Sequence, residues 1–550
     1  MPDHNDLFSK VLLEEQLRSN RITRKELLRR AFAGAVIIGT SGVLGACGGD
    51  GSNDPEGQSQ GGAQKQKRGG TLRLGTAGGS SSDTVDAHTP VTHPDQARVV
   101  QLNDSLARYD EKFEFELSLA EEFAAEKADV WTIRLLEGLE FHNGKTVTAD
   151  DVIFSLQRII DPDVPAFGAG GLTSLDPNGM KKLDERTVRL TLKQPDVTIR
   201  EELAQYFNGI VPVDYNPKKP VGVGPFMFES FTPGQESRFV RNPNYWREGE
   251  PYADEIVIID FPEASARVNA LLGGQVDAID DVPFGQVPVI EGNANLNILE
   301  APSGGWLPFT MRIDAAPFDD VRVRQAMRLL VNRQQMVDQA LAGHGTVAND
   351  LYSPFDSCYA SDLPQREQDI DQAKSLLRQA GQSDLTVELQ TADVAAGLLE
   401  AAQVIAEQAK AAGVTINVKK LDSGTFYGDN YLKWTFAQDF WGSRPYFQQV
   451  AAGSLPDSAY NETHWPPDST FLNLIAEAKR TVDEKKRCEL LHQAQELEYN
   501  EGGHIIWGFF NHVDAHSAKI TGLVPDRGTL PLNQYGFSHV SFVELSLIHI

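Results

Sequence analysis

The sequence lacks the local motifs that mark most enzymes. The 550-residue chain has no Gly-x-Ser-x-Gly, His-Glu-x-x-His or paired-cysteine motif, and its twelve histidines are scattered. The glycine-rich segment 222–225 is not followed by the Lys-Ser/Thr pair that a phosphate-binding loop requires. His512 and His516 are four residues apart, a spacing that could ligate a transition metal, but two neutral surface histidines are the simpler explanation. We therefore predict no enzymatic activity, no resident metal and no cofactor.

Positive charge is scarce. The chain has 50 Lys and Arg against 77 Asp and Glu, a formal charge of −27. Such a surface repels a phosphate backbone, so we expect no nucleic-acid partner. The hydrophobic fraction of 41% is ample for packed lobes, and the length requires more than one core.

Long apolar runs are absent except near the N-terminus. A basic stretch at 21–30 precedes the sixteen uncharged residues 31–46, which are too few to span a membrane and are typical of a signal peptide. Arg29, Arg30 and Phe32 resemble a twin-arginine export motif, and Cys47 ends a segment that resembles a bacterial lipobox. We predict a signal peptide over 1–46, lipid attached to Cys47 and a flexible tether over 47–68. The alternative is a short anchor helix with an incidental cysteine.

Cysteine is also scarce, since only three occur. If Cys47 carries lipid, Cys358 and Cys488 remain, and outside the cytoplasm they can form one disulfide. Their spacing permits this pairing but does not require it.

Segments with strand and helix patterns alternate along the body. Alternating or continuous apolar runs predict strands, and stripes with helical spacing predict helices between them. Examples are a strand at 256–259, a helix at 264–272 and a strand at 276–279, which together predict a β-α-β unit. Thr148, three residues before Asp151, predicts a helix N-cap. The pattern in both halves indicates an α/β fold with two lobes and a ligand cleft between them.

Several segments in a fixed order carry a resemblance to a known family. They are 131–155, with its Gly-Leu-Glu-Phe-His-Asn-Gly run, 221–226 with 241–246, and 317–326. Together these segments resemble the family 5 extracellular solute-binding proteins, the receptors for peptides, dipeptides and nickel that serve ABC importers. One departure is Val223, where the family usually has threonine. We expect most of these motif residues to hold the fold, with Gly144 and Gly224 supplying turns.

The resemblance implies a hinged two-lobed clamp, like that of periplasmic binding proteins, with an extra α+β subdomain. The expected parts are lobe I (69–112, 213–305 and 516–550), its subdomain (113–212) and lobe II (306–515). It also implies partners, namely a membrane permease with its ATPase. We expect the protein to be an exported monomer held at the outer or periplasmic face of the cytoplasmic membrane by lipid on Cys47.

Candidate ligand contacts follow from side-chain chemistry in two segments, at the expected hinge near Trp306 and Phe309, and in the loop after the first strand, where His88 and His93 are expected at the mouth of the cleft. A loop at 440–446 combines large rings with a cation, and in peptide-binding relatives the comparable loop carries an aspartate where Arg444 stands here. A guanidinium pairs with carboxylates, so we predict an anionic or acceptor-rich group on the ligand; the alternative is a structural pair with Asp439. The second segment is 461–465, which otherwise forms a tight turn with its tryptophan in the core. The candidates are Trp441, Gly442, Arg444, Tyr446, Asn461, Trp465, Trp306, Phe309 and His88.

These observations predict a receptor that captures a small peptide or peptide-like solute and passes it on unchanged. The alternatives are an exported hydrolase that uses the same cleft, a receptor for a metal chelate or a sugar, and a structural lipoprotein. The sequence does not choose the solute, because one fold serves many ligands.

Overall fold

The computed structural model describes residues 66–164 and 166–543. The predicted signal peptide, its Arg29, Arg30 and Phe32, the lipidation site Cys47 and nearly all of the tether lie outside the described residues.

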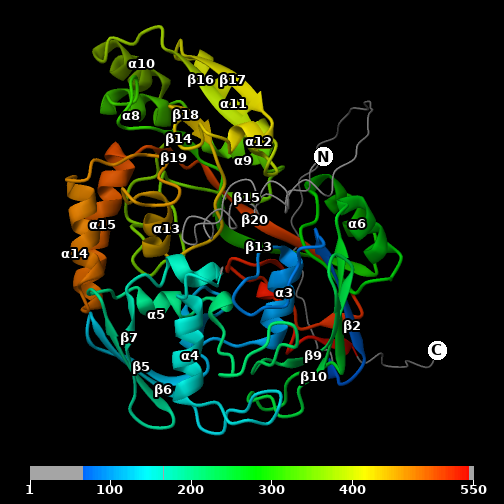
Figure 1. Ribbon diagram of the computed structural model, residues 1–550. Helices are drawn as coiled ribbons and strands as arrows, with labels where there is room; N and C mark the ends of the chain where they lie inside the picture. The colour runs from blue at the N-terminus through cyan, green and yellow to red at the C-terminus, as the bar shows by residue number, and fades with distance from the viewer. Residues whose placement is uncertain (1–65, 165, 544–550) are drawn as a thin grey trace.

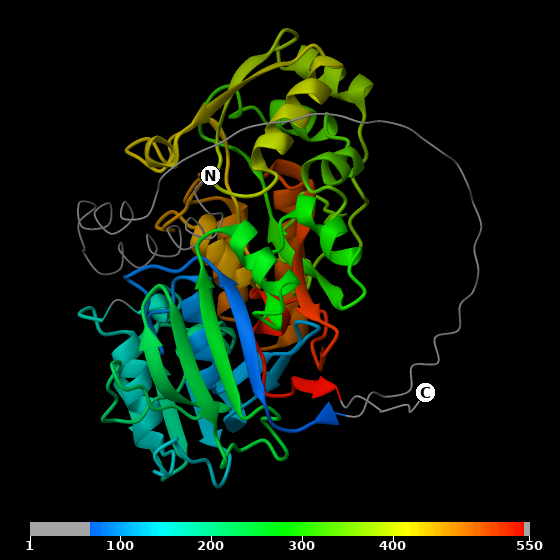
Figure 2. The same ribbon diagram turned by 90° about the vertical axis from the view of Figure 1, so that its right-hand side faces the viewer.

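Lobe I is built on an eight-stranded mixed sheet (Figures 1 and 2). Its strands, in spatial order, are β13 (Leu296–Trp306), β20 (Gly508–Ser517), β12 (Ala278–Ile279), β2 (Thr71–Ala77), β11 (Glu255–Phe261), β10 (Glu236–Arg241) and β9 (Phe226–Thr232), with β15 (Gly345–Val347) paired to β20. The predicted β-α-β unit is present, because β11 and β12 both run parallel to β2 and α6 (Ala264–Leu272) connects them. The remaining helices of the lobe are α3 (His93–Leu102), α7 (Val287–Glu291) and the short α16 (Pro531–Gln534).

Two small sheets extend lobe I. One joins β1 (Gln66–Lys67), β22 (Ser541–Val543) and β21 (Ile520–Thr521), and the other pairs β3 (Ala107–Tyr109) with β4 (Phe115–Leu117).

The subdomain is a four-stranded antiparallel sheet covered by one helix. Its strands are β5 (Ala120–Lys127), β6 (Val130–Leu135), β8 (Thr187–Leu192) and β7 (Leu175–Lys182), and its helices are α4 (Ala149–Ile159), α5 (Ile199–Glu202) and the single turn η2 (Tyr206–Asn208). Thr148 caps α4 as predicted: its hydroxyl and its backbone N–H both donate to the Asp151 carboxylate, at 2.8 and 2.9 Å. Val152, Leu156 and Ile159 then face the core of the subdomain.

Lobe II has its own five-stranded sheet, flanked by helices (Figure 1). The strands, in order, are β17 (Thr415–Leu421), β16 (Thr386–Ala392), β18 (Phe436–Gln438), β14 (Phe309–Met311) and β19 (His504–Ile505). The helices are α8 (Val321–Leu329), α9 (Arg333–Ala340), α10 (Ile370–Gln379), α11 (Leu398–Lys410), α12 (Ser423–Phe426), α13 (Tyr446–Gly453), α14 (Thr470–Lys479) and α15 (Glu484–Glu501). Cys358 and Cys488 form a disulfide that ties the loop after β15 to α15, so the pairing that the sequence left open is made.

By sheet membership the chain passes between the two sheets four times: by direct crossings at 307–308 between β13 and β14 and at 506–507 between β19 and β20, and by longer connections into and out of β15. Because β20 pairs along its length with β13, it runs across the lobe boundary expected at 515–516. Gly508–Ser517 therefore belongs to the sheet of lobe I. Short paired crossings of this kind are a suitable hinge between two lobes.

Candidate functional site

The two lobes meet at a pair of tryptophans beside the first crossing. Trp306 ends β13, and Trp441 follows β18 in lobe II. Each backbone N–H donates to the other residue's carbonyl at 2.9 Å, and the rings stack with centroids 6.0 Å apart. Both side chains are buried, at 1% and 5% exposure. The sequence placed both residues in the site, and the structure brings them together.

The loop 440–446 continues from Trp441 along lobe I. The Ser443 carbonyl accepts a hydrogen bond from the Thr529 hydroxyl at 2.7 Å, and the Ser443 hydroxyl accepts one from the backbone N–H of Gly304 at 2.6 Å. Arg444 lies over the Trp441 ring, 5.5 Å from its centroid. Burial raises the pKa of Tyr206 in η2, and the charge of Arg444 opposes that rise. The predicted Trp441–Gly442–Arg444 segment thus lies where the lobes approach each other.

Behind the tryptophan pair lies a ladder of aromatic rings. Tyr352 stacks on Trp306 at 5.6 Å and on Tyr446 at 5.2 Å. Both tyrosine hydroxyls donate to the buried Glu498 carboxylate, at 2.5 and 2.6 Å. Burial raises the pKa of Glu498 to about 7, and the two hydroxyl hydrogen bonds offset part of that rise. Glu498 supports the rings that form the hinge side of the site.

Glu498 should make stability depend on pH. The folded protein holds the Glu498 proton up to about pH 7, whereas an unfolded chain releases it near the ordinary value of 4.5, so the folded state binds more protons between these values. Its contribution to stability is complete below pH 4.5 and is lost as pH rises through 7. Because glutamine cannot titrate, the stability of wild type relative to Glu498→Gln should fall by about 3 kcal/mol between pH 4.5 and 8. Urea unfolding of both proteins across this range measures the difference, and a constant difference would contradict the assignment.

Four predicted contacts lie in other environments. Phe309 is in the core of lobe II against Phe436, and Tyr446 is held by Glu498. Trp465 stacks on Phe471 with centroids 4.6 Å apart, and the Asn461 side chain accepts a hydrogen bond from the backbone N–H of His464 at 2.9 Å. These last two contacts match the alternative of a turn with a core tryptophan.

His88 is completely buried instead of lying at a cleft mouth. Its Nε2 contacts the Gly209 carbonyl at 2.9 Å, and its Nδ1 accepts from Arg158 at 2.6 Å. Burial, with the charge of Arg158, lowers the pKa of His88 to about 4, so the ring is neutral at physiological pH. Nearby, His93 begins α3 instead of lying in a loop.

The sequence missed two buried carboxylates beside Trp441. Asp439 directly follows β18, and the sequence indicates it only as a partner for Arg444; in the structure it accepts hydrogen bonds from the hydroxyls of Tyr427 and Tyr431 at 3.2 and 2.7 Å. Glu462, in the loop before α14, contacts His504 at 3.4 Å. An acidic residue inside an aromatic segment, as in Gln438-Asp439-Phe440-Trp441, was the available signal.

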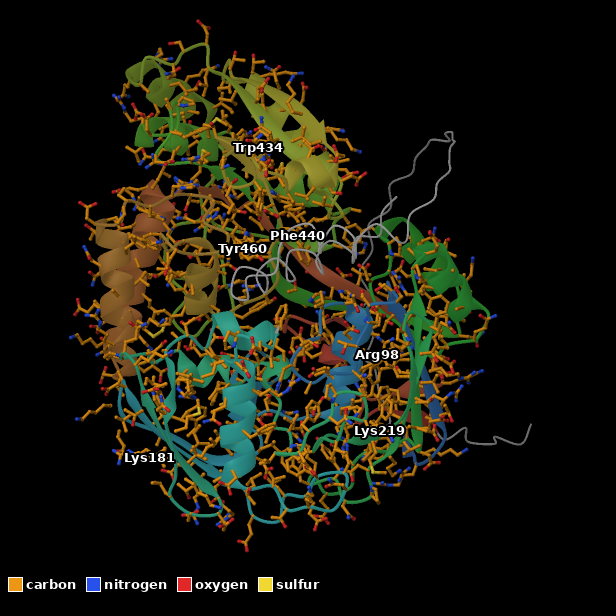
Figure 3. All side chains as sticks on the ribbon, in the orientation of Figure 1. Arg98, Lys181, Lys219, Trp434, Phe440 and Tyr460 are labelled. Atoms are coloured by element: carbon orange, nitrogen blue, oxygen red, sulfur yellow. A yellow bond between two sulfur atoms is a disulfide. The ribbon has the colours of Figure 1, made fainter. Side chains whose placement is uncertain are left out.

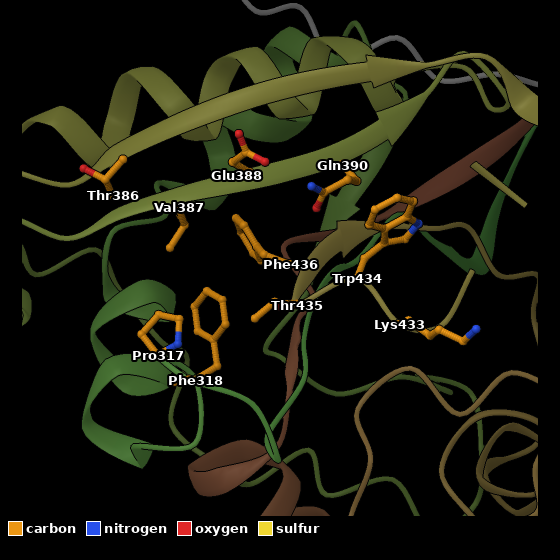
Figure 4. A pocket seen from close by; sticks show the side chains of 11 residues that line it. Pro317, Phe318, Thr386, Val387, Glu388, Gln390, Lys433, Trp434, Thr435 and Phe436 are labelled. Carbon is orange, nitrogen blue, oxygen red and sulfur yellow. The ribbon is translucent and has the colours of Figure 1, made fainter. Parts of the chain in front are cut away.

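Lobe II also carries a more open hollow of about 300 Å³ (Figure 4). It lies between β16 and the segment before β18, and Pro317, Phe318, Glu388 and Trp434 are among its walls. Every wall residue belongs to lobe II. A solute bound there would not contact lobe I, so this hollow does not suit a clamp.

Within the described residues, no set of three or more His, Cys, Asp or Glu side chains is placed to hold a metal ion. His512 and His516 lie on β20, not on a helix, and burial lowers the pKa of both.

In the part of the chain that the structure describes, no helix combines the length and apolarity needed to cross a membrane.

Two lobes, each with its own sheet, joined by two short direct crossings with aromatic side chains beside them, define a two-lobed periplasmic binding protein. Solved structures with this fold include the binding protein AgaA of A. tumefacien in complex with agropinic acid (TM-score 0.69, 24% identity, 87% of this chain and 100% of that chain). Another is the ABC transporter substrate-binding protein CtaP of Listeria monocytogenes (TM-score 0.76, 20% identity, 87% and 100%).

Sequence comparison identifies the family. Residues 114–459 match the model of bacterial extracellular solute-binding proteins, family 5 Middle. Di/tripeptide-binding protein 1 of Pseudomonas aeruginosa is 26% identical over 410 residues, covering 67% of this chain and 75% of its own. The dipeptide-binding protein of Escherichia coli is 26% identical over 469 residues, covering 77% and 85%. The chain therefore belongs to the family 5 solute-binding proteins, as its motifs indicated.

Proposed function

We propose that the protein is the substrate-binding lipoprotein of an ABC importer and that it captures a small peptide or peptide-like solute between its lobes. The observation that carries this proposal is the loop 440–446, which leaves lobe II, contacts β13 of lobe I and presents Trp441 and Arg444 where the lobes meet. A solute that contacts both lobes favours the closed arrangement by its greater affinity for that state. Relatives of comparable length are named for di- and tripeptides, which supports this solute class.

The remaining parts of the proposal concern location and partners. Signal-peptide removal before Cys47 and acylation of its thiol would leave the lobes on a tether over 47–68, at the outer or periplasmic face of the cytoplasmic membrane. The closed monomer would then dock on a permease and release the solute without altering it. The boundaries of lobe I, its subdomain (113–212) and lobe II are part of this proposal, with the second crossing placed at 506–507.

Ligand capture is tested by a thermal-shift screen of the purified protein against peptides, opines, sugars and metal chelates, with mass spectrometry of each bound and recovered compound. A solute at 100 times its Kd should add about 2.7 kcal/mol to stability. Recovery of the intact compound supports a receptor. Recovery of cleaved products would instead identify a hydrolase, and no saturable stabilisation by any compound would contradict the proposal.

Arg444 should contribute to solute affinity through an anionic group of the solute. Replacing it with alanine removes a charge-assisted hydrogen bond, and we expect the Kd of the captured solute to rise at least about tenfold. Arg322→Ala is the control, because Arg322 is exposed in lobe II and pairs with Asp320. Isothermal calorimetry measures both variants. An unchanged Kd for Arg444→Ala would show that the residue is structural.

A further inference from the structure

Lobe II also contacts the rest of the molecule away from the direct crossings, at the C-terminal end of α14. There the backbone N–H of Val197, in the loop between β8 and α5 of the subdomain, donates to the carbonyl of Lys479, the last residue of α14, at 3.0 Å. The Lys479 ammonium lies 3.0 Å from the Asp196 carboxylate. Figure 1 shows α14 at the margin of lobe II, above the subdomain, whereas β13 and β20, which adjoin the crossings, lie near the middle of the molecule. The subdomain and lobe II therefore meet at a margin as well as through the hinge.

Asp196 is buried in this contact and is paired across it. The residue is 1% exposed, and one carboxylate oxygen accepts hydrogen bonds from the hydroxyl and the backbone N–H of Thr198, at 2.6 and 3.0 Å. The other oxygen faces Lys479, so among the described ion pairs the cation of Asp196 comes from lobe II. Separation of the lobes would expose this carboxylate, which water can then solvate. A contact of this kind can break and form again as the lobes move.

Apolar side chains continue the contact. Val197 and Ile199 of the subdomain belong to the same buried cluster as Ile475 and Ala478 of α14. A rotation about the crossings displaces the margin of a lobe further than the region beside the crossings. The apolar surfaces and the hydrogen bond at this margin must therefore separate when the lobes open.

A buried acidic group on the same side of the subdomain opposes closure. Burial raises the pKa of Glu201, on α5, to about 8, with a further contribution from the charge of Asp356 in lobe II. The charge of Glu202 also raises this pKa, whereas Arg487 of α15 and Arg200 lower it. Within the described residues, the Oε2 atom of Glu201 is buried without a hydrogen-bond partner. Opening would return the carboxylate to water, so closure costs free energy at Glu201 while it gains free energy at Lys479.

We propose that the contact of Lys479 with Asp196 and Val197 is an edge latch, which forms when the lobes close and breaks when they open. This inference rests on the proposed receptor function and deepens it, because it names residues that set solute affinity without contacting the solute. The latch supplies part of the free energy of closure and Glu201 offsets some of it. The solute then supplies the remainder through its greater affinity for the closed state.

The Val197 amide reports on the latch directly, because its hydrogen exchanges with solvent only when the bond to Lys479 is open. Hydrogen exchange is measured at residue resolution on the purified protein without added solute. The internal reference is the Leu192 amide, which donates to the Asp129 carbonyl at 2.8 Å inside the subdomain. Lys479→Met removes the charge but keeps the carbonyl that accepts from Val197. We expect this variant to raise the Val197 exchange rate at least about tenfold and to leave the Leu192 rate unchanged.

Two further variants separate the latch from a general effect of charge. Lys486→Met is the matched control, because Lys486 is an exposed residue of α15 that faces Glu477 within lobe II, and it should leave the Val197 rate unchanged. Glu201→Gln should slow Val197 exchange, because it removes the carboxylate that opposes closure. Small-angle X-ray scattering of the same proteins should give a larger radius of gyration for Lys479→Met than for wild type or Lys486→Met.

Each of the other results is decisive. An unchanged Val197 rate in Lys479→Met would overturn the latch. A faster rate without a larger radius of gyration would mean local fraying, and faster exchange of Leu192 as well would mean a loosened subdomain; either would also overturn it. The full latch effect without capture of any compound in the thermal-shift screen would support the latch and overturn the receptor function. Capture of a compound without the latch effect would do the reverse.

Discussion

Replacing Arg98 with methionine is expected to lower the free energy of unfolding by about 3–5 kcal/mol. Arg98 lies on α3 and is completely buried (labelled in Figure 3). Its guanidinium donates to Asp260 at 2.5 and 2.6 Å, to Asp95 at 3.1 Å and to Asp83 at 3.3 Å, and its Nε donates to Ser237 at 3.1 Å. The one cation therefore joins three buried acids from different segments of lobe I. Without it, these acids stay buried with no compensating charge.

Urea unfolding of wild type and variant measures the loss. Arg238→Met is the matched control, because Arg238 pairs with Glu236 and Glu255 at the surface and its removal should cost less than about 1 kcal/mol. The deficit of Arg98→Met should shrink below pH 6, since burial already raises the pKa values of Asp95 and Asp260 to about 7 and protonation neutralises both. An equal, small loss in both variants would contradict this account of the cluster.

Gly224→Ala should destabilise lobe I by about 3 kcal/mol or more. The segment 221–226 crosses the C-terminal end of α3, where the Gly224 N–H donates to the Leu102 carbonyl at 2.9 Å. A Cβ at residue 224 would lie 2.4 Å from the Leu102 carbonyl carbon, 2.5 Å from the Gln101 oxygen and 2.6 Å from the Asn103 nitrogen. All three are backbone atoms, so no side-chain rotation relieves the overlap.

Gly170→Ala provides the comparison, because no atom lies within 4 Å of the corresponding Cβ and its φ is not in the left-handed region. Thermal unfolding should show a clearly lower Tm for Gly224→Ala and little change for Gly170→Ala. Equal Tm values would mean that the two backbone segments can separate without cost.

The role of Gly224 in the segment 221–226 differs from the turn that the sequence predicted. The sequence predicted that Gly144 and Gly224 supply turns. Gly144 does so with φ of 78°, whereas Gly224 is required by close approach to α3. The difference depends on a tertiary contact between residues about 120 positions apart, which no local pattern reveals.

Local elements were predictable where periodicity was strong. The helix at 264–272 has the predicted bounds, and α4 begins at the predicted cap, Thr148. The pairing of β20 with β13 was not predictable, because nothing near 508–517 indicates a partner about 200 residues earlier. That long-range pairing puts residues 508–515, which the sequence assigned to lobe II, in the sheet of lobe I.

Only part of the candidate site was predictable, because some of its residues become neighbours only through long-range contacts. Trp441 and Arg444 could be found from residue chemistry within one loop, and Trp306 from its place near the expected hinge. Asp439 and Glu462 become neighbours only after folding, because the end of β18 and the loop before α14 are brought together in lobe II. Phe309 and Trp465 look like ligand contacts in the sequence, but in the structure both side chains pack against phenylalanine rings in the core.

The central claim is that a captured solute holds the two lobes together and leaves intact. Small-angle X-ray scattering of the purified protein, with and without the solute recovered from the screen, tests this claim most directly. The account predicts a smaller radius of gyration in the bound state, and a solute that mass spectrometry then recovers unchanged. Saturating solute that leaves the radius of gyration of the protein unchanged, or that is recovered as fragments, would contradict it.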